Sequence, residues 1–222
     1  IIITHFHPDH VFGLPIYLMG LYLLGFFKKR VRREPLAIYA PVEALQLVRA
    51  MVGLYQMQTW TDMFALEYHP IETRPGCVVA EDEDFSIVST PTHHSVSSIA
   101  LRFLVKDNGH SLVYSSDTAP CPEVEALAWG VDLLIHEASG AGFGHTSAAE
   151  AGAVAARANA ARLETAPERC IMRHARYSAR SSLMEGSTVA APVPLSRTRF
   201  FRPKYDCSAT KRFTSILSPT FP

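Results

Sequence analysis

The chain begins Ile1-Ile2-Ile3-Thr4-His5-Phe6-His7-Pro8-Asp9-His10, and this stretch decides the fold. Residues 1–4 are apolar and β-branched, which predicts a buried strand. The next six residues are predicted to form a polar loop that Pro8 keeps from becoming helical. Functional residues often lie on a polar loop that directly follows a rigid strand. Because the chain starts within this strand, without an initiator Met or a signal-peptide pattern, we expect it to derive from a longer parent protein.

Four potential metal ligands, His5, His7, Asp9 and His10, fall within six positions of this loop. In an extended segment, residues i and i+2 point the same way, so His5 and His7 can hold one metal ion. Asp9 and His10 follow the bend at Pro8 and can turn toward a second ion. Imidazole and carboxylate ligands favour zinc, with manganese or iron as alternatives. The competing interpretation is a solvent-exposed His-rich loop without a metal.

A long apolar segment follows the loop and ends in a basic run. Residues 11–27 are almost entirely apolar, and residues 28–33 are nearly all Lys or Arg. A membrane span needs about 20 apolar residues, whereas this run is shorter and contains three Gly and one Pro. We therefore predict a buried helix and no membrane span. The basic run is interpreted as a solvated helix end.

The rest of the chain, up to residue 163, alternates between predicted strands and helices, which indicates an α+β fold. Asp107-Asn108-Gly109 is a strong hairpin signal, and Ser147 with Glu150 fits a helix capping box. The predicted strands are residues 36–39, 65–68, 77–80, 85–90, 98–105, 111–115 and 131–135, and the predicted helices are residues 41–52, 122–129 and 147–161.

Composition divides the chain into two parts. The whole chain has 222 residues, with 21 basic and 21 acidic side chains and 48% hydrophobic residues, which argues against a generally basic nucleic-acid wrapper. Residues 1–163 carry 11 basic and 17 acidic side chains, whereas residues 164–222 carry 10 and 4. We predict a partial enzyme domain at residues 1–163 and a divergent, poorly ordered basic tail at residues 164–222. Only four cysteines are present, so we expect a reducing, cytoplasmic location.

The histidine motif and the Gly13-Leu14-Pro15 that follows it resemble the metallo-β-lactamase superfamily, specifically its ribonuclease Z-like branch. Further segments match that branch in order: residues 92–95, 113–118, 132–138 and 144–147. The resemblance covers about residues 1–163 and implies a layered αβ/βα sandwich, incomplete at both ends. It implies a dinuclear zinc hydrolase in which a metal-bridging hydroxide is the nucleophile.

The resemblance also assigns roles beyond the first motif. It implies that His94 is a metal ligand, with its neighbour His93 as the alternative, and that Asp117 bridges the two ions. Asp9 binds metal and orients the nucleophile. Glu137 and His145 are placed beside the leaving group, where the carboxylate holds the imidazole that donates a proton. The alternatives are that Asp117 is only a turn residue, that Glu137 is a buried polar anchor and that His145 is a helix-start residue.

Two departures from the family pattern affect the predicted function. Only 23 residues separate His94 from Asp117, which leaves no room for the arm with which longer relatives grip transfer RNA. The strand that carries the last His ligand is expected to be missing after residue 163, with His174 as a candidate substitute. We therefore predict a hydrolase of small-molecule or RNA phosphodiesters, a homodimer being a candidate assembly. A transfer-RNA 3′-processing endoribonuclease is the alternative, and a truncated, inactive metal-binding product is the second alternative.

Overall fold

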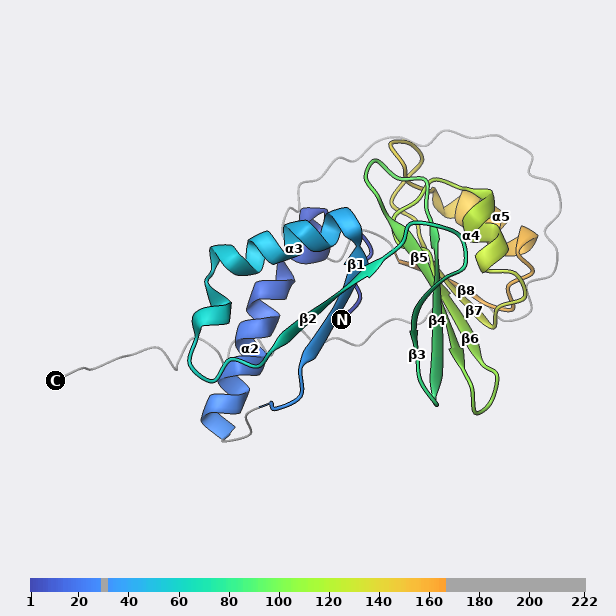
Figure 1. Cartoon of the computed structure of the whole chain (residues 1–222). Coiled ribbons are helices and arrows are strands. Elements are labelled where there is room, and N and C mark those ends of the chain that lie inside the picture. Colours follow the sequence, from blue (N-terminus) through green and yellow to red (C-terminus); the bar gives the residue numbers. More distant parts are fainter. Residues whose placement is uncertain (29–31, 167–222) are drawn as a thin grey trace, which may run out of the picture. The chain divides into compact units, whose positions relative to one another are not determined.

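The computed structural model describes residues 1–28 and 32–166, and the elements below belong to these residues (Figure 1). The helices are α1 (Pro8–Val11), α2 (Gly13–Lys28), α3 (Val42–Leu54), the 3₁₀ turn η1 (Met57–Thr59), α4 (Pro122–Leu127) and α5 (Ala148–Arg157). The strands are β1 (Leu36–Pro41), β2 (Leu66–Ile71), β3 (Cys77–Glu81), β4 (Phe85–Pro91), β5 (Ile99–Val105), β6 (Ser111–Tyr114), β7 (Leu133–Glu137) and β8 (Leu163–Ala166).

The described strands form two sheets. Strands β1 and β2 pair in parallel, and the other six form a mixed sheet in the order β3-β4-β5-β6-β7-β8. Strand β5 is antiparallel to both β4 and β6, whereas β6 and β7 are parallel. Strands β4, β6 and β7 therefore run in the same direction. Their carboxyl ends meet at one edge of the sheet, and the loops that leave this edge lie close together.

Helices pack on both sheets, as expected for an α+β fold. Helix α3 contacts β1 and β2, where Val48 and Ile38 are fully buried in one core cluster. Helix α4 packs on β4 and β5, while α5 packs on β7 and β8, where Val154 and Leu134 are fully buried (Figure 1). A third cluster places Ile2 against buried residues of the larger sheet, which ties the N-terminal segment to that sheet.

Residues 1–4, predicted as a buried strand, form only an isolated parallel bridge between Ile2 and Tyr39, with Ile1 and Ile2 half-buried. The loop after them, predicted to be free of helix, contains a short helix. The amide N of Ile3 donates to the Tyr39 carbonyl, and the Tyr39 amide donates to the Ile1 carbonyl. Pro8 then begins helix α1 instead of preventing one. The prediction for Pro8 was wrong because proline lacks only an N–H that the first helical turn would leave unpaired in any case. The short helix turns the side chains of Asp9 and His10 back toward the segment before it.

Residues 11–27 were predicted to form a buried helix; the helix is present, but the prediction of burial was wrong. Helix α2 exists, but only Leu14, Leu18 and Gly25 are buried in it. Leu21 and Tyr22 are half-buried against the core, and the remaining large apolar side chains are exposed, Phe27 to 73%. Residues 8–28 are long and apolar enough to cross a membrane by length and composition, a test that soluble core helices and signal sequences also pass. The expectation of no membrane span stays a prediction.

Two local predictions are confirmed and one is wrong. Asp107-Asn108-Gly109 lies between the paired strands β5 and β6, and the capping box of Ser147 and Glu150 begins α5. The strand predicted to be missing after residue 163 is present as β8, which pairs in parallel with β7. Residues 164–166 thus belong to the sheet. The rest of the predicted tail, including His174, lies outside the described residues.

Candidate metal centre and active site

The candidate site residues come from segments at one edge of the larger sheet. His94 follows β4, Asp117 follows β6 and Glu137 ends β7, so all three lie at the carboxyl ends of strands that run in the same direction. The Thr4 carbonyl accepts a hydrogen bond from the amide of Ile99, the first residue of β5, which brings His5 to the same edge. Strand direction therefore explains why residues far apart in the sequence converge.

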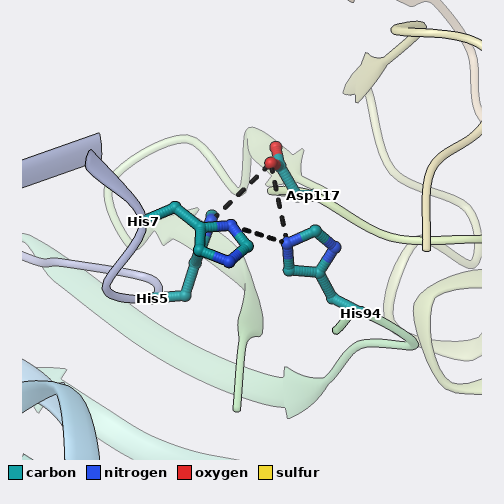
Figure 2. Close-up of side chains that lie close together, drawn as sticks. All are labelled: His5, His7, His94 and Asp117. Carbon is teal, nitrogen blue, oxygen red and sulfur yellow. Dashed lines mark hydrogen bonds and ion pairs between the residues drawn. The ribbon is translucent and has the colours of Figure 1, made fainter. Parts of the chain in front are cut away.

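Three imidazoles and a carboxylate form the first group of potential ligands, His5, His7, His94 and Asp117 (Figure 2). Each offers an atom that lies within 4.8 Å of the others. His94 Nε2 is 3.1 Å from His7 Nδ1, and Asp117 Oδ2 is 3.6 Å from His5 Nε2. The side chains of His5 and His94 are almost completely buried. Such a set of nitrogen and oxygen donors matches the ligand chemistry of zinc.

A second group shares one atom with the first. Asp9, His10 and Asp117 offer ligand atoms at similar spacing. His10 Nε2 is 3.3 Å from the same Oδ2 of Asp117 and 3.4 Å from Asp9 Oδ2. One carboxylate oxygen thus faces both groups, which is the arrangement that a pair of ions with a common anionic ligand requires.

The electrostatics of His5 and Asp117 favour the protonation states that bind metal. Burial, followed by the neighbouring His10, lowers the pKa of His5 to about 3, so its imidazole is neutral at physiological pH. Burial opposes ionisation of Asp117, but the hydrogen bond and charge of His10 outweigh it and lower the pKa of the carboxyl group. Donating this hydrogen bond to Asp117 raises the pKa of His10, whose imidazole must lose its proton before it can bind a metal ion. Neutral imidazole and ionised carboxylate are the forms that coordinate metals.

His5 provides a direct test of whether the residues present fit a metal. Its Nε2 atom is fully buried and has no hydrogen-bond partner among the described residues. A buried polar atom without a partner costs free energy, so its position needs an explanation. Its Nδ1 atom lies 3.3 Å from Thr4 Oγ1, whose hydroxyl accepts a hydrogen bond from Ser116. The ring is therefore held on one side, while Nε2 points at the carboxylate that both groups share. The donor set fits a metal ion.

Glu137 and His145 form a hydrogen-bonded pair next to the ligands. Glu137 Oε1 is 3.0 Å from His145 Nδ1, and it also accepts a hydrogen bond of 2.9 Å from the amide of Thr118. Glu137 is buried, whereas a quarter of the His145 side chain is exposed. The carboxylate fixes the ring so that Nε2 is left free to carry a proton. The two residues, together with Asp117, also satisfy the spacing of a third ligand group.

The structure brings His94, and not the alternative His93, into the ligand group. His93 is exposed, and its backbone carbonyl accepts a hydrogen bond of 2.8 Å from Ala119. Sequence reasoning missed Gly144, whose carbonyl oxygen is 3.0 Å from His94 Nδ1. Such a contact fixes the imidazole of a metal ligand so that Nε2 faces the ion. The Gly-rich run before His145 was the available signal, because close backbone approach requires glycine.

Replacing Gly144 with alanine should weaken metal binding. A Cβ atom there would lie 3.0 Å from both Cα and Nδ1 of His94, so the ligand would have to shift. We expect zinc affinity, measured by titration calorimetry, to fall about 10- to 100-fold, which is typical when a hydrogen bond that orients a metal-binding histidine is lost. Gly142→Ala is the matched control: it carries the same kind of positive-φ strain with nothing within 4 Å. Equal losses in the two variants would contradict the role of Gly144.

Comparisons with known proteins agree with this arrangement. Residues 1–165 match the beta-lactamase superfamily domain. A ribonuclease Z of Methanothermobacter thermautotrophicus is 30% identical, covering 87% of this chain and 75% of that protein. A ribonuclease Z of Leuconostoc mesenteroides subsp. mesenteroides is 25% identical, covering 73% of this chain and 66% of that protein. The crystal structure of human tRNase Z, short form, has the same fold, with a TM-score of 0.63, 23% identity and coverage of 76% and 72% of the two chains.

Proposed function

Because the chain belongs to the metallo-β-lactamase superfamily, a family of hydrolases, and is ribonuclease Z-like, we propose that it is a dinuclear zinc hydrolase of phosphodiester-type substrates. The observation that supports the proposal is the position of Asp117 Oδ2, 3.3 Å from a ligand atom of one group and 3.6 Å from one of the other. A structural carboxylate would need only one such partner. The shared oxygen is suited to two cations held close together.

In this proposal the first ion is held by His5, His7 and His94, the second by Asp9 and His10, and Asp117 contacts both. Zinc is proposed from the donor set, with manganese or iron as alternatives. When bound, the ions lower the pKa of water, which supplies a nucleophile at neutral pH, and offset the charge of the phosphoryl group.

In this proposal, side chains of the protein orient the nucleophile and protonate the leaving group. The Asp9 side chain is half exposed at the edge of the cluster, from where it binds metal and orients the nucleophile. Glu137 holds His145 through Nδ1, so that Nε2 can give a proton to the departing alcohol. Because Glu137 is itself fixed by the amide of Thr118, the proton donor is held in place before substrate binds.

The loop lengths favour a compact substrate. In the structure, the interval from His94 to Asp117 is filled by β5, a tight turn and β6, with no inserted arm. Small-molecule or short RNA phosphodiesters are therefore the leading substrates. Transfer-RNA 3′ processing is the alternative, supported by the names of the relatives. An inactive product that only binds metal is the second alternative.

The three possibilities are separated by one set of measurements on the full chain. Bound metal is quantified as purified, after chelation and after readdition of zinc or manganese. Each sample is assayed with bis(p-nitrophenyl) phosphate and with a transfer-RNA precursor that carries a 3′ trailer. Metal-dependent turnover of the first substrate alone supports the leading proposal. Cleavage of the precursor after its discriminator base supports the RNA-processing alternative, whereas bound metal without any turnover supports the inactive product.

We also propose a homodimer in a cytoplasmic location, with an enzyme domain that includes β8 and so extends past residue 163 to at least residue 166. The support for a dimer is the exposed apolar surface of α2, which includes Ile16, Leu24 and Phe27, since large exposed apolar patches often mark interfaces. Sedimentation analysis of the full chain and of Leu24→Glu tests this proposal: a variant that sediments like the parent chain would rule out this surface as the interface.

A further inference from the structure

An open cavity of about 450 Å³ adjoins the first ligand group on the side of His94. Its lining includes His94 itself and Gly144, the residue before the proton donor His145. The cavity therefore lies beside the ligand His94 and next to the residue that precedes the proton donor in the chain. Its volume lies in the range of sites that bind small molecules. Nothing in the proposed hydrolysis yet uses it.

Phe143 is the most exposed large apolar side chain in the described residues, at 98%, and it lines this cavity. It lies at the tip of a tight turn that the His145 amide closes by donating to the Gly142 carbonyl at 3.0 Å. Its φ of 52° is a left-handed conformation that residues with a Cβ rarely adopt. Exposure and backbone conformation both oppose folding, so an aromatic ring here points to a role in binding.

Polar groups line the same cavity. Thr92, His93 and Ser95 line it, of which His93 and Ser95 are exposed, while the Thr92 hydroxyl donates to the Asp117 carbonyl. The backbone of His93 is held by two hydrogen bonds, from its amide to Thr118 Oγ1 and from Ala119 to its carbonyl. An aromatic surface with hydrogen-bonding groups around it suits a flat, polar-edged ring. Nucleobases have both properties, and unstacked bases in RNA are commonly bound in this way.

We propose that this cavity binds the nucleobase on the leaving-group side of the scissile phosphate and that Phe143 stacks on that base. The inference rests on the proposed phosphodiester hydrolysis and names the part of the substrate that the site recognises. The side is set by the chain itself, because the turn that carries Phe143 ends at His145. Phe143 is thus a specificity residue, while the metal ligands and His145 act on the phosphate.

The test uses the zinc-loaded full chain and three dinucleotide substrates. One is a dinucleoside monophosphate with both adenines, one has an abasic ribose on the leaving side, and one has it on the other side. Stacking of one base is commonly worth about 5- to 100-fold in affinity. We expect Phe143→Ala to raise KM for the complete dinucleotide by about that factor with little change in kcat. Phe143→Trp should behave like the parent chain, and so should Phe27→Ala, an exposed aromatic outside the cavity.

The abasic substrates decide the outcome. For the leaving-side abasic substrate, the parent chain and Phe143→Ala should share one high KM, whereas loss of the other base should leave the effect of Phe143 intact. An equal rise in KM of Phe143→Ala on all three substrates would overturn the proposal. So would a Phe143 effect that disappears when the other base is removed. If the parent chain cleaves nothing, the proposed function fails separately. Fluorescence quenching of a 2-aminopurine dinucleotide by the parent chain but not by Phe143→Ala would then still support the base site, and no difference would overturn it.

Discussion

Replacing Asp117 with alanine should abolish binding of at least one metal ion and lower turnover by on the order of a thousandfold. The substitution removes the one oxygen that faces both ligand groups, 3.6 Å from His5 Nε2 and 3.3 Å from His10 Nε2. Metal ions contribute several kcal/mol of charge stabilisation in the transition state, and about 1.4 kcal/mol corresponds to a factor of ten in rate. The measurements are metal content per chain and turnover of a generic phosphodiester.

Two further variants separate loss of the ligand from loss of the fold. Asp117→Asn keeps the size of the side chain but not its charge, so it should also lose metal while melting as cooperatively as the metal-free parent chain. Asp107→Ala removes an exposed carboxylate from the turn between β5 and β6 and should leave both metal content and turnover unchanged. Unaltered metal binding and turnover in Asp117→Ala would exclude Asp117 as a ligand and remove the main support for a dinuclear site.

The structure brings the predicted site residues close together where the signal was local or came from the family pattern. His5, His7, Asp9 and His10 lie within six positions, so their proximity is built into the chain. Asp117 and Glu137 were assigned from the resemblance of residues 113–118 and 132–138 to the family pattern. The choice between His93 and His94 could not be settled in this way, because the period of two applies only within a strand. In the structure, His94 Nε2 lies 3.1 Å from His7 Nδ1 and 3.9 Å from Asp117 Oδ2, whereas His93 is exposed.

The failures share one physical cause, which is that burial and pairing depend on partners distant in the sequence. The apolar residues of α2 cover all of its sides, so the sequence indicates no particular buried face, and only Leu14, Leu18 and Gly25 are buried. Residues 163–166 carry too little apolar pattern to read as a strand. They become one because β7 offers a free edge, where Leu163 pairs with Leu134. The Gly-rich run before His145 indicated a close backbone approach there but not its partner, since His94 is 50 positions away.

Replacing His145 with alanine should slow hydrolysis most where the leaving group most needs a proton. With a ribonucleoside alcohol as leaving group, we expect kcat to fall by about 10²- to 10⁴-fold, the usual contribution of a positioned general acid. With p-nitrophenolate, which departs without a proton, the loss should be far smaller. Metal content should not change, because the first two ligand groups remain intact. The measurement is kcat for a dinucleotide and for bis(p-nitrophenyl) phosphate, at equal zinc loading.

The comparison of leaving groups also tests the other role that the geometry allows for His145. Asp117, Glu137 and His145 lie close enough to form a ligand group of their own, and a ligand would give a different pattern. His145→Ala would then lose metal and slow both substrates equally, which would contradict a proton donor. For the dinucleotide, Glu137→Gln should have a kcat between those of the parent chain and His145→Ala. Its amide oxygen can still accept a hydrogen bond from His145 Nδ1 but lacks the charge that stabilises the protonated ring. His110→Ala, an exposed histidine remote from the ligand groups in the β5–β6 turn, should leave all rates unchanged.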